Sequence, residues 1–214
     1  TLAPEVEGGL ELVRRVVQKG IVASIGHSDS TYEEALRAVE AGISHACHTY
    51  NAMKGFHHRE PGALGAVLTT DKITAELVDD GIHAHPAAMR ILVKCKGTDR
   101  IILVTDAIVG TGMRGRYKVG GRDIIVTMKS SRFLDGSIAG SVLTMDSAVK
   151  NMMELVGISL RDAVKMATVN PARRIGVYNR KGSLEVGKDA DITIVDDRLN
   201  VHMTMVMGRI VYKR

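Results

Sequence analysis

Three side chains suited to metal binding or proton transfer stand just after apolar runs of the chain. His27 follows the run at 21–25, His48 follows the run at 43–47, and Asp106 follows the run at 101–104. Neutral imidazoles gathered at one end of a sheet are good ligands for a divalent metal. A single His at a strand end more often hydrogen-bonds a loop. Two on successive strands, with an Asp on a later strand, favour a metal site.

Asp106 is the candidate for proton transfer. It follows an apolar strand, so the strand would shield its carboxylate from water and place it close to a metal at the sheet edge. It could take a proton from an attacking water, whose pKa a bound metal lowers to about 7, and return the proton to a leaving amine. The alternative reading is an ordinary turn or helix-capping Asp, which is common after strands.

Two further segments carry side chains suited to an anionic ligand. In Asp80-Gly81-Ile82-His83 the glycine permits a tight turn that would aim His83 across the sheet edge, and a structural role is equally compatible. Arg59 suits a phosphate because its planar guanidinium gives paired charged hydrogen bonds, although pairing with Glu60 is the alternative. The backbone N–H of Ala52 could add a donor.

The elements that must position these residues alternate between strand and helix. Apolar, β-branched runs at 21–25, 43–47, 73–78 and 101–104 predict buried strands, and helical patterns cover 9–19, 31–41 and 85–94. This alternation predicts βα units with a parallel sheet. A His or Asp follows every one of the four strands, which favours a (β/α)8 barrel over a doubly wound sheet. Only four units are evident, whereas such a barrel needs eight strands and about 250 residues, so we expect an incomplete barrel of the TIM type.

The second half of the chain has a different pattern. Glycine-rich loops flank 123–128, residues 133–140 predict a hairpin or turn, and helices are predicted at 141–156 and 160–168, with Ser159 capping the second. Strand-like runs at 191–195, 203–207 and 209–212 predict part of a small β-sandwich appendage. We therefore expect an incomplete barrel over 1–180 and the strands of a small β domain over 181–214.

Composition excludes several classes of function. The 214 residues carry a formal net charge of +5, but the basic residues are scattered and predict no nucleic-acid-binding stripe. No apolar run reaches about 18 residues and no signal-peptide pattern is present, which disfavours a membrane or secreted protein. Two cysteines without a CxxC pattern fit a reducing cytoplasm.

Taken together, the motifs resemble one family, the N-acetylglucosamine-6-phosphate deacetylases of the amidohydrolase superfamily. The most specific segments are His48-Thr49-Tyr50-Asn51-Ala52-Met53 and Arg59-Glu60-Pro61-Gly62. The resemblance covers nearly the whole chain, in the family's order. The other matching segments are Thr1-Leu2-Ala3-Pro4-Glu5, Gly26-His27-Ser28, Asp80-Gly81-Ile82-His83, Val104-Thr105-Asp106-Ala107, Ala139-Gly140-Ser141-Val142-Leu143-Thr144-Met145 and Asn170-Pro171-Ala172.

The resemblance implies a role for each candidate residue. His27 and His48 would bind a divalent metal, with zinc as first choice and iron or another divalent ion as alternatives, and Asp106 would be the general base and acid. The implied partners are a sugar phosphate and a second copy of the chain, since Arg59 of one subunit would reach the neighbour's phosphate. The substrate-binding residues would be Asn51, Ala52, Arg59, Asp80, His83, Ile138, Ala139 and Gly140.

One departure from the family pattern concerns the metal. The family's third ligand is a Glu in a His-x-Glu-Gly-Pro segment that precedes Thr-Leu-Ala-Pro-Glu, and no such segment occurs here. Glu5 belongs to the later motif and is expected to be structural. We therefore expect the chain to be a fragment that, in isolation, binds metal weakly and turns over poorly.

Two other functions remain open from the sequence. Another amidohydrolase acting on a C–N bond would share the metal but lack the phosphate contact, so phosphate dependence through Arg59 separates it from the first reading. A catalytically inactive sugar-phosphate-binding module is the second alternative, and acetate release with added metal separates it from an enzyme.

Overall fold

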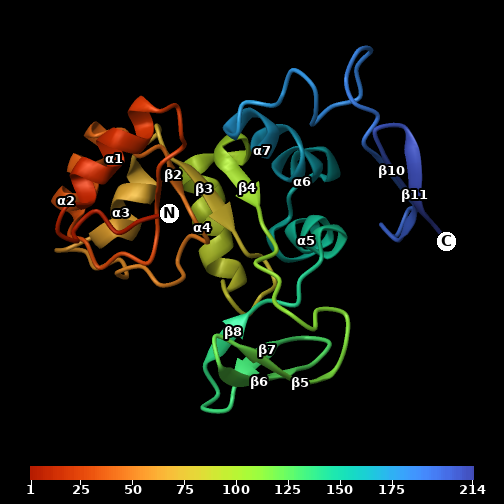
Figure 1. Cartoon of the computed structure of the whole chain (residues 1–214), viewed down its shortest axis with the longest axis horizontal. Coiled ribbons are helices and arrows are strands. Elements are labelled where there is room, and N and C mark those ends of the chain that lie inside the picture. Colours follow the sequence, from red (N-terminus) through yellow and green to blue (C-terminus); the bar gives the residue numbers. More distant parts are fainter.

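The first half of the chain forms a parallel sheet with helices between its strands (Figure 1). The computed structural model describes all 214 residues. The strands β1 (Ser24–Ile25), β2 (His45–Ala46), β3 (Thr74–Leu77) and β4 (Ile101–Leu103) lie in the order β1-β2-β3-β4, and every neighbouring pair is parallel. The predicted βα repeat is confirmed, although the strands are shorter than the apolar runs.

Helices connect and cover these strands. Their bounds are α1 (Gly9–Gln18), α2 (Tyr32–Glu40), α3 (Gly62–Thr69) and α4 (Pro86–Lys96), followed by a 3-10 turn at Thr98–Arg100. The predicted start of α2 is confirmed: the Thr31 side chain accepts from the backbone of Glu34, whose carboxylate in turn accepts from Thr31. The start of α4 is capped by His85, whose side chain accepts the backbone N–H of Ala87.

The two faces of the sheet differ in character. On β3, Ala75 and Leu77 are fully buried among aliphatic side chains of the main core, whereas Thr74 and Glu76 point to the opposite face and are only partly buried. Successive residues of a strand point to opposite faces, so the alternation separates an apolar face from a polar one. The polar and titratable side chains of this sheet therefore lie on its polar face and in the loops that follow the strands.

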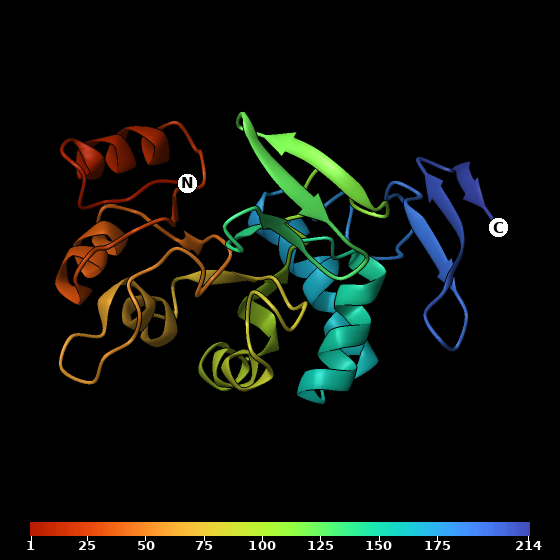
Figure 2. The ribbon, with the colours of Figure 1, turned by 90° about the horizontal axis from the view of Figure 1, so that it is seen from below.

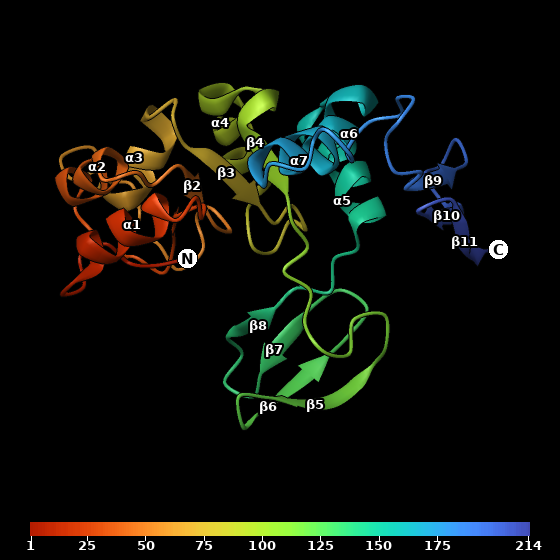
Figure 3. The ribbon, with the colours of Figure 1, turned by 45° about the horizontal axis from the view of Figure 1, so that its top comes forward.

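An antiparallel sheet is inserted after β4. It contains β5 (Gly115–Val119), β6 (Arg122–Val126), β7 (Ser131–Phe133) and β8 (Ile138–Gly140), in chain order. Figure 3 shows this sheet standing apart from the helices, joined to them by the two segments that flank it. The hairpin predicted at 133–140 corresponds to β7 and β8, but the sequence did not predict the full sheet.

Helices and a second small sheet complete the chain. The bounds are α5 (Met145–Asn151), a π-helical turn at Met152–Val156, α6 (Leu160–Ala167), α7 (Val169–Arg174), β9 (Ile192–Val195), β10 (Val201–Val206) and β11 (Arg209–Lys213). The last three strands form an antiparallel sheet in the order β11-β10-β9, at the far end of the molecule from α1 (Figure 2). No helix in the structure combines the length and apolar character needed to cross a bilayer.

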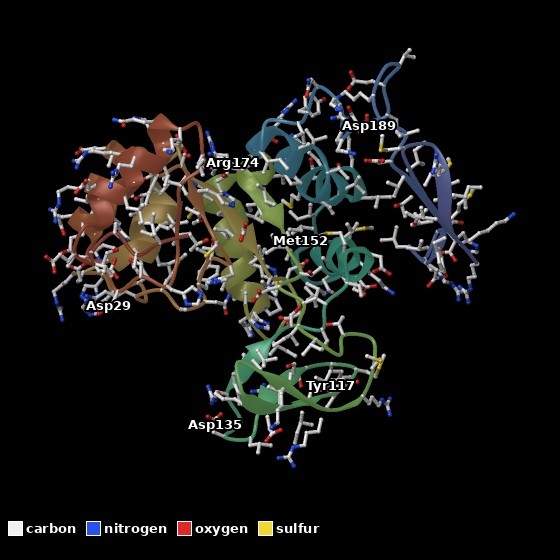
Figure 4. All side chains as sticks on the ribbon, viewed as in Figure 1. Asp29, Tyr117, Asp135, Met152, Arg174 and Asp189 are labelled. Carbon is white, nitrogen blue, oxygen red and sulfur yellow. The ribbon has the colours of Figure 1, made fainter.

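The two ends of the parallel sheet can be identified from their contacts. Arg174 donates hydrogen bonds to the backbone oxygen and hydroxyl of Ser44, at the start of β2, and so marks the amino end. Asp29 lies in the loop that leaves the carboxyl end of β1. Figure 4 labels both residues, on opposite sides of this half of the molecule.

A buried carboxyl lies just beyond β3. The Asp79 side chain is fully buried, and neither of its oxygens has a hydrogen-bond partner. Burial raises the pKa of Asp79 to about 8, and the charge of Asp80 adds to the rise. The folded state therefore retains a proton that the unfolded chain releases.

This buried carboxyl predicts a pH dependence of stability. Between the ordinary pKa of Asp and about pH 8 the folded state binds more protons, so the free energy of unfolding must fall as the pH rises. The loss is at most about 1.4 kcal/mol per pH unit, or roughly 3 °C in Tm. In thermal melts between pH 5.5 and 9, stability should fall more steeply in the wild type than in Asp79→Asn, which keeps the contribution of the His48 imidazole. The control Asp197→Asn, at an exposed Asp, should follow the wild type, and parallel curves for all three proteins would contradict the assignment.

Candidate active site

His27 and His48 meet at the carboxyl edge of the parallel sheet. Their Nε2 atoms are 2.9 Å apart, and the ring planes stand edge to face at 77°. Two nitrogens bound to one tetrahedral zinc at about 2.0–2.1 Å would lie about 3.3 Å apart. A small opening of the pair would therefore accommodate a metal ion, so the two residues fit the divalent metal that the sequence implied.

The backbone is strained where each of these residues occurs. His27, His48 and Asp106 have φ values of 52°, 26° and 49°, in the left-handed region that non-glycine residues rarely adopt. Such conformations persist only where the surrounding contacts impose them, and they cluster at functional sites. Each of the three strained residues closely follows a parallel strand. This indicates that the directions of their side chains matter for function.

Glu5 fixes the loop that carries His27. Its carboxylate accepts a hydrogen bond from the Ser28 hydroxyl at 2.8 Å and another from the Asp29 backbone N–H at 2.7 Å. Gly26 is needed on the other side, since a Cβ there would lie 2.1 Å from the Cys47 sulfur. The expectation that Glu5 is structural agrees with these contacts.

The loop after β2 is held by Glu76, a residue that the sequence analysis did not single out. One carboxylate oxygen is 2.9 Å from His45 Nε2, and the other accepts the backbone N–H of His48 at 3.1 Å. Burial tends to raise the pKa of Glu76, but the hydrogen bonds from His45 and from the His48 backbone outweigh it and lower the pKa. The available signal was a lone carboxylate between Ala75 and Leu77, in a strand whose other polar residue is Thr74.

The surroundings of His48 are electronegative. A hydrogen bond with the Cys47 thiol, 3.5 Å from His48 Nε2, raises the pKa of His48 to about 9, although burial opposes the rise. The Asp106 carboxylate contributes to the rise, so it lies near enough to act on the imidazole. Asp106 follows β4 as His27 follows β1 and His48 follows β2, so the three residues lie after strands of the same parallel sheet.

The inserted sheet returns to the backbone of Asp106. Ser141, just after β8, donates its backbone N–H to the Asp106 oxygen at 2.9 Å and its hydroxyl to the Thr105 oxygen. A Cβ on Gly140 would lie 3.1 Å from Ile108, so this position requires a glycine for a close approach as well as for its φ of 147°. Ile138, Ala139 and Gly140, which form β8, are thus brought beside Asp106.

The structure places Asn51 and Ala52 in the loop after β2. The Asn51 amide donates to the backbone oxygens of His48 and Thr49, so part of its hydrogen bonding stabilises the turn. Ala52 has a φ of 49° and, together with His27, lines a shallow depression. Ala52 therefore borders the same depression as His27.

Arg59 is exposed and has no carboxylate partner. Its guanidinium contacts only His58, at 3.0 Å. Glu60 instead accepts hydrogen bonds from the backbone N–H groups of Tyr32 and Gly62, at the starts of α2 and α3. The alternative in which Arg59 pairs with Glu60 is therefore wrong, and the Arg59 charge remains available to an anion.

Asp80 and His83 form a compact turn after β3. One Asp80 oxygen accepts the backbone N–H groups of Ile82 and His83, and the other is 2.7 Å from His83 Nδ1. Burial tends to raise the pKa of Asp80, but these hydrogen bonds lower it. The pair leaves His83 Nε2 free to contact a ligand, and Asp80 acts by orienting that ring.

No set of three or more His, Cys, Asp or Glu side chains in the structure is arranged to hold a metal ion. His27 and His48 are nevertheless paired, with their Nε2 atoms 2.9 Å apart. What this chain offers to a metal is therefore two nitrogen ligands.

Comparison with known proteins relates the chain to enzymes. The model of the amidohydrolase family matches residues 5–211. The chain is 46% identical over 211 residues to an N-acetylglucosamine-6-phosphate deacetylase of Lysinibacillus sphaericus, covering 98% of this chain and 54% of that protein. It is 41% identical over 210 residues to an N-acetylgalactosamine-6-phosphate deacetylase of Escherichia coli O157:H7, covering 98% and 55%.

A solved structure agrees with these relatives. A mutant N-acetyl-D-glucosamine-6-phosphate deacetylase of Mycobacterium smegmatis, in complex with N-acetyl-D-glucosamine-6-phosphate, has a TM-score of 0.93 and 35% identity. The match covers 98% of this chain and 56% of that chain. The chain spans about half the length of the curated relatives it matches.

The contacts of Glu5 predict its effect on stability. Glu5→Ala removes two hydrogen bonds to a carboxylate and should lower the free energy of unfolding by about 1.5–3 kcal/mol, measured by chemical denaturation. The control Glu7→Ala, at an exposed Glu without a partner, should change it by less than about 0.5 kcal/mol. Equal effects of the two substitutions would show that Glu5 does not hold the His27 loop.

Proposed function

The chain belongs to the amidohydrolase family, and on this basis we propose that it carries the catalytic edge of a metal-dependent deacetylase. The proposed reaction removes the acetyl group from N-acetylglucosamine-6-phosphate and yields glucosamine-6-phosphate and acetate. The observation that carries the proposal is the approach of His27 Nε2 to within 2.9 Å of His48 Nε2, at the carboxyl ends of neighbouring parallel strands. The deacetylase relatives supply the substrate class.

His27 and His48 would hold the metal through their Nε2 atoms. A divalent ion bound there supplies an activated water at neutral pH and polarises the acetamide carbonyl. We propose zinc as first choice, with iron or another divalent ion as alternatives, because imidazole accepts all of these.

Asp106 would move the proton. Its carboxylate would accept a proton from the attacking water and then donate it to the nitrogen as the C–N bond breaks. The backbone contact with Ser141 fixes the turn from which this side chain projects. The Asp106 side chain is exposed, so the expectation that the strand shields its carboxylate from water is wrong, and this exposure leaves it accessible to a bound substrate.

The remaining residues would bind the sugar phosphate. Arg59 has a free guanidinium for the phosphate, and the backbone N–H of Ala52 adds a donor. His83, oriented by Asp80, would hydrogen-bond the ligand, and Asn51 would fix the turn beside it. The strand Ile138–Gly140 would line the sugar.

Two features of the assembly are also proposed. We propose that the four βα units are part of a TIM-type barrel, supported by their parallel order and by the family match. We also propose a homodimer in which Arg59 reaches the phosphate bound by the neighbouring subunit, supported by the exposure of Arg59 and its lack of a carboxylate partner. A molar mass of a single chain in solution would contradict the dimer.

The galactosamine epimer is a second candidate substrate. The relative from E. coli O157:H7, at 41% identity, is an N-acetylgalactosamine-6-phosphate deacetylase. Acetate release from both epimers under the same conditions distinguishes the two substrates, and the proposal expects the larger kcat/KM for the glucosamine form.

Asp106→Asn tests the proposed proton transfer. The native protein with added Zn²⁺ should release acetate from N-acetylglucosamine-6-phosphate, and the substitution should lower kcat by about 10²- to 10⁴-fold, because the amide cannot accept the proton. Zinc affinity should change little. The control Asp197→Asn should retain wild-type kcat, and full activity in Asp106→Asn would exclude the assigned role.

Arg59→Ala tests phosphate recognition. Loss of charged hydrogen bonds worth about 1.5–3 kcal/mol should raise KM for N-acetylglucosamine-6-phosphate by about 10- to 100-fold. The kcat/KM for unphosphorylated N-acetylglucosamine should stay unchanged. The control Arg14→Ala, at an exposed position on α1, should affect neither substrate. An equal loss on both substrates would indicate that Arg59 acts elsewhere than at the phosphate.

A further inference from the structure

Glu76 lies where β2 leaves the sheet. The register pairs His45 with Thr74 and Ala46 with Ala75, and Glu76 is the next residue of β3. From there β3 continues its ladder with β4, while the chain after β2 turns away. Glu76 therefore faces the first residues of the loop that carries the proposed metal ligand.

Both parts of Glu76 bind this loop. The side-chain oxygen Oε2 accepts the backbone N–H of His48 at 3.1 Å, and the backbone oxygen accepts the N–H of Thr49 at 2.9 Å. The residue held between them, His48, has a φ of 26°. Because this conformation is costly for a residue with a Cβ, the two hydrogen bonds provide the constraint that maintains it.

The His48 ring has no other support at its inner nitrogen. Nδ1 is buried and lacks a hydrogen-bond partner, whereas a metal-binding His usually donates that N–H to a neighbouring group. The direction of the ring must therefore depend on its backbone. The group that holds the His48 backbone therefore fixes the direction of the ring, as a hydrogen-bond partner at Nδ1 otherwise would.

The Glu76 carboxylate is itself oriented. Oε1 is 2.9 Å from His45 Nε2, and His45 Nδ1 is 2.7 Å from the Thr74 hydroxyl. The side chains of His45 and Glu76 are 10% and 24% exposed, so solvent competes little with these contacts. Both carboxylate oxygens have a defined partner, which leaves little freedom of rotation.

We propose that Glu76, held by His45, is a positioning residue that sets the direction of the His48 imidazole. It acts through the backbone N–H of His48 and does not contact the metal or the substrate. The inference rests on the proposed function for its consequence, metal affinity, but the hydrogen bond itself can be tested without metal.

The experiment compares Glu76→Met, Glu76→Gln and Thr74→Val in the native protein. Met retains the length of the side chain but accepts no hydrogen bond, whereas Gln retains one acceptor oxygen for the His48 N–H. Thr74→Val is the matched control, because it removes the other contact of His45 and leaves Glu76 in place. Thermal melts establish that each variant is folded.

The first readout is amide hydrogen exchange by NMR in metal-free protein. Glu76→Met should speed exchange at the His48 amide by at least about 10-fold, while Thr49, bonded to the Glu76 backbone, stays protected. The second readout is Zn²⁺ affinity by competition with a chromophoric chelator. Here Glu76→Met should lose about 10- to 100-fold, as is usual for residues that support metal ligands.

Glu76→Gln should recover most of the His48 amide protection and most of the Zn²⁺ affinity. Thr74→Val should change neither quantity by more than about threefold. Unchanged His48 exchange in Glu76→Met would overturn the proposal, as would a Thr74→Val effect of equal size or a failure of Glu76→Gln to recover. If the wild type binds zinc but releases no acetate, the proposed function fails and the positioning role stands. If the wild type binds no zinc, the exchange measurement alone decides.

Discussion

The left-handed backbone at the ends of three parallel strands is the constraint on which this site depends. His27, His48 and Asp106 each adopt positive φ, at a cost of about 1–3 kcal/mol per residue. Each is offset by a separate set of hydrogen bonds: Glu5 holds the loop after β1, Glu76 the loop after β2, and Ser141 the turn after β4. Three distant parts of the chain thus hold the backbones of His27, His48 and Asp106 in unfavourable conformations after three strands of the sheet.

The polar face of the sheet also helps to hold the backbone of His48. The His45–Glu76 pair is largely buried, and burying a carboxylate costs desolvation that its contacts do not fully return. An apolar pair of similar volume would pack against the sheet at lower cost. The pair is therefore better explained by the hydrogen bond that it directs to His48 than by a contribution to stability. The aliphatic face of β3, with Ala75 and Leu77, supplies the stability instead.

Much of the fold followed from the sequence because hydrophobic periodicity and capping residues are local signals. The four parallel strands and the cap at Ser159 were predicted correctly. Helix α3 was missed, since Gly62 and Gly65 weaken its helical pattern and Pro61 suggests a loop. The sheet β5–β8 was reduced to a hairpin because its short strands are mostly exposed and lack clean alternation.

The candidate site was predictable in its residue types and only partly in its geometry. The positions of His27, His48 and Asp106 after strands placed them at one edge, because parallel strands share a direction. Arg59 lacks a carboxylate partner because Glu60 instead accepts backbone N–H groups at the starts of two helices. The hydrogen bond between the His48 N–H and Glu76 depends on the strand register. Both are tertiary relations between residues far apart in the sequence, which no local pattern reveals.

The central claim is that the His27 and His48 imidazoles share one divalent ion. Crystals of the native protein grown with Zn²⁺, with diffraction data collected on both sides of the zinc absorption edge, test it most directly. The account predicts an anomalous peak about 2.0–2.1 Å from both Nε2 atoms, with the Asp106 carboxylate beside it. A map without a peak between the two rings, or with the rings turned apart and zinc bound elsewhere, would contradict it.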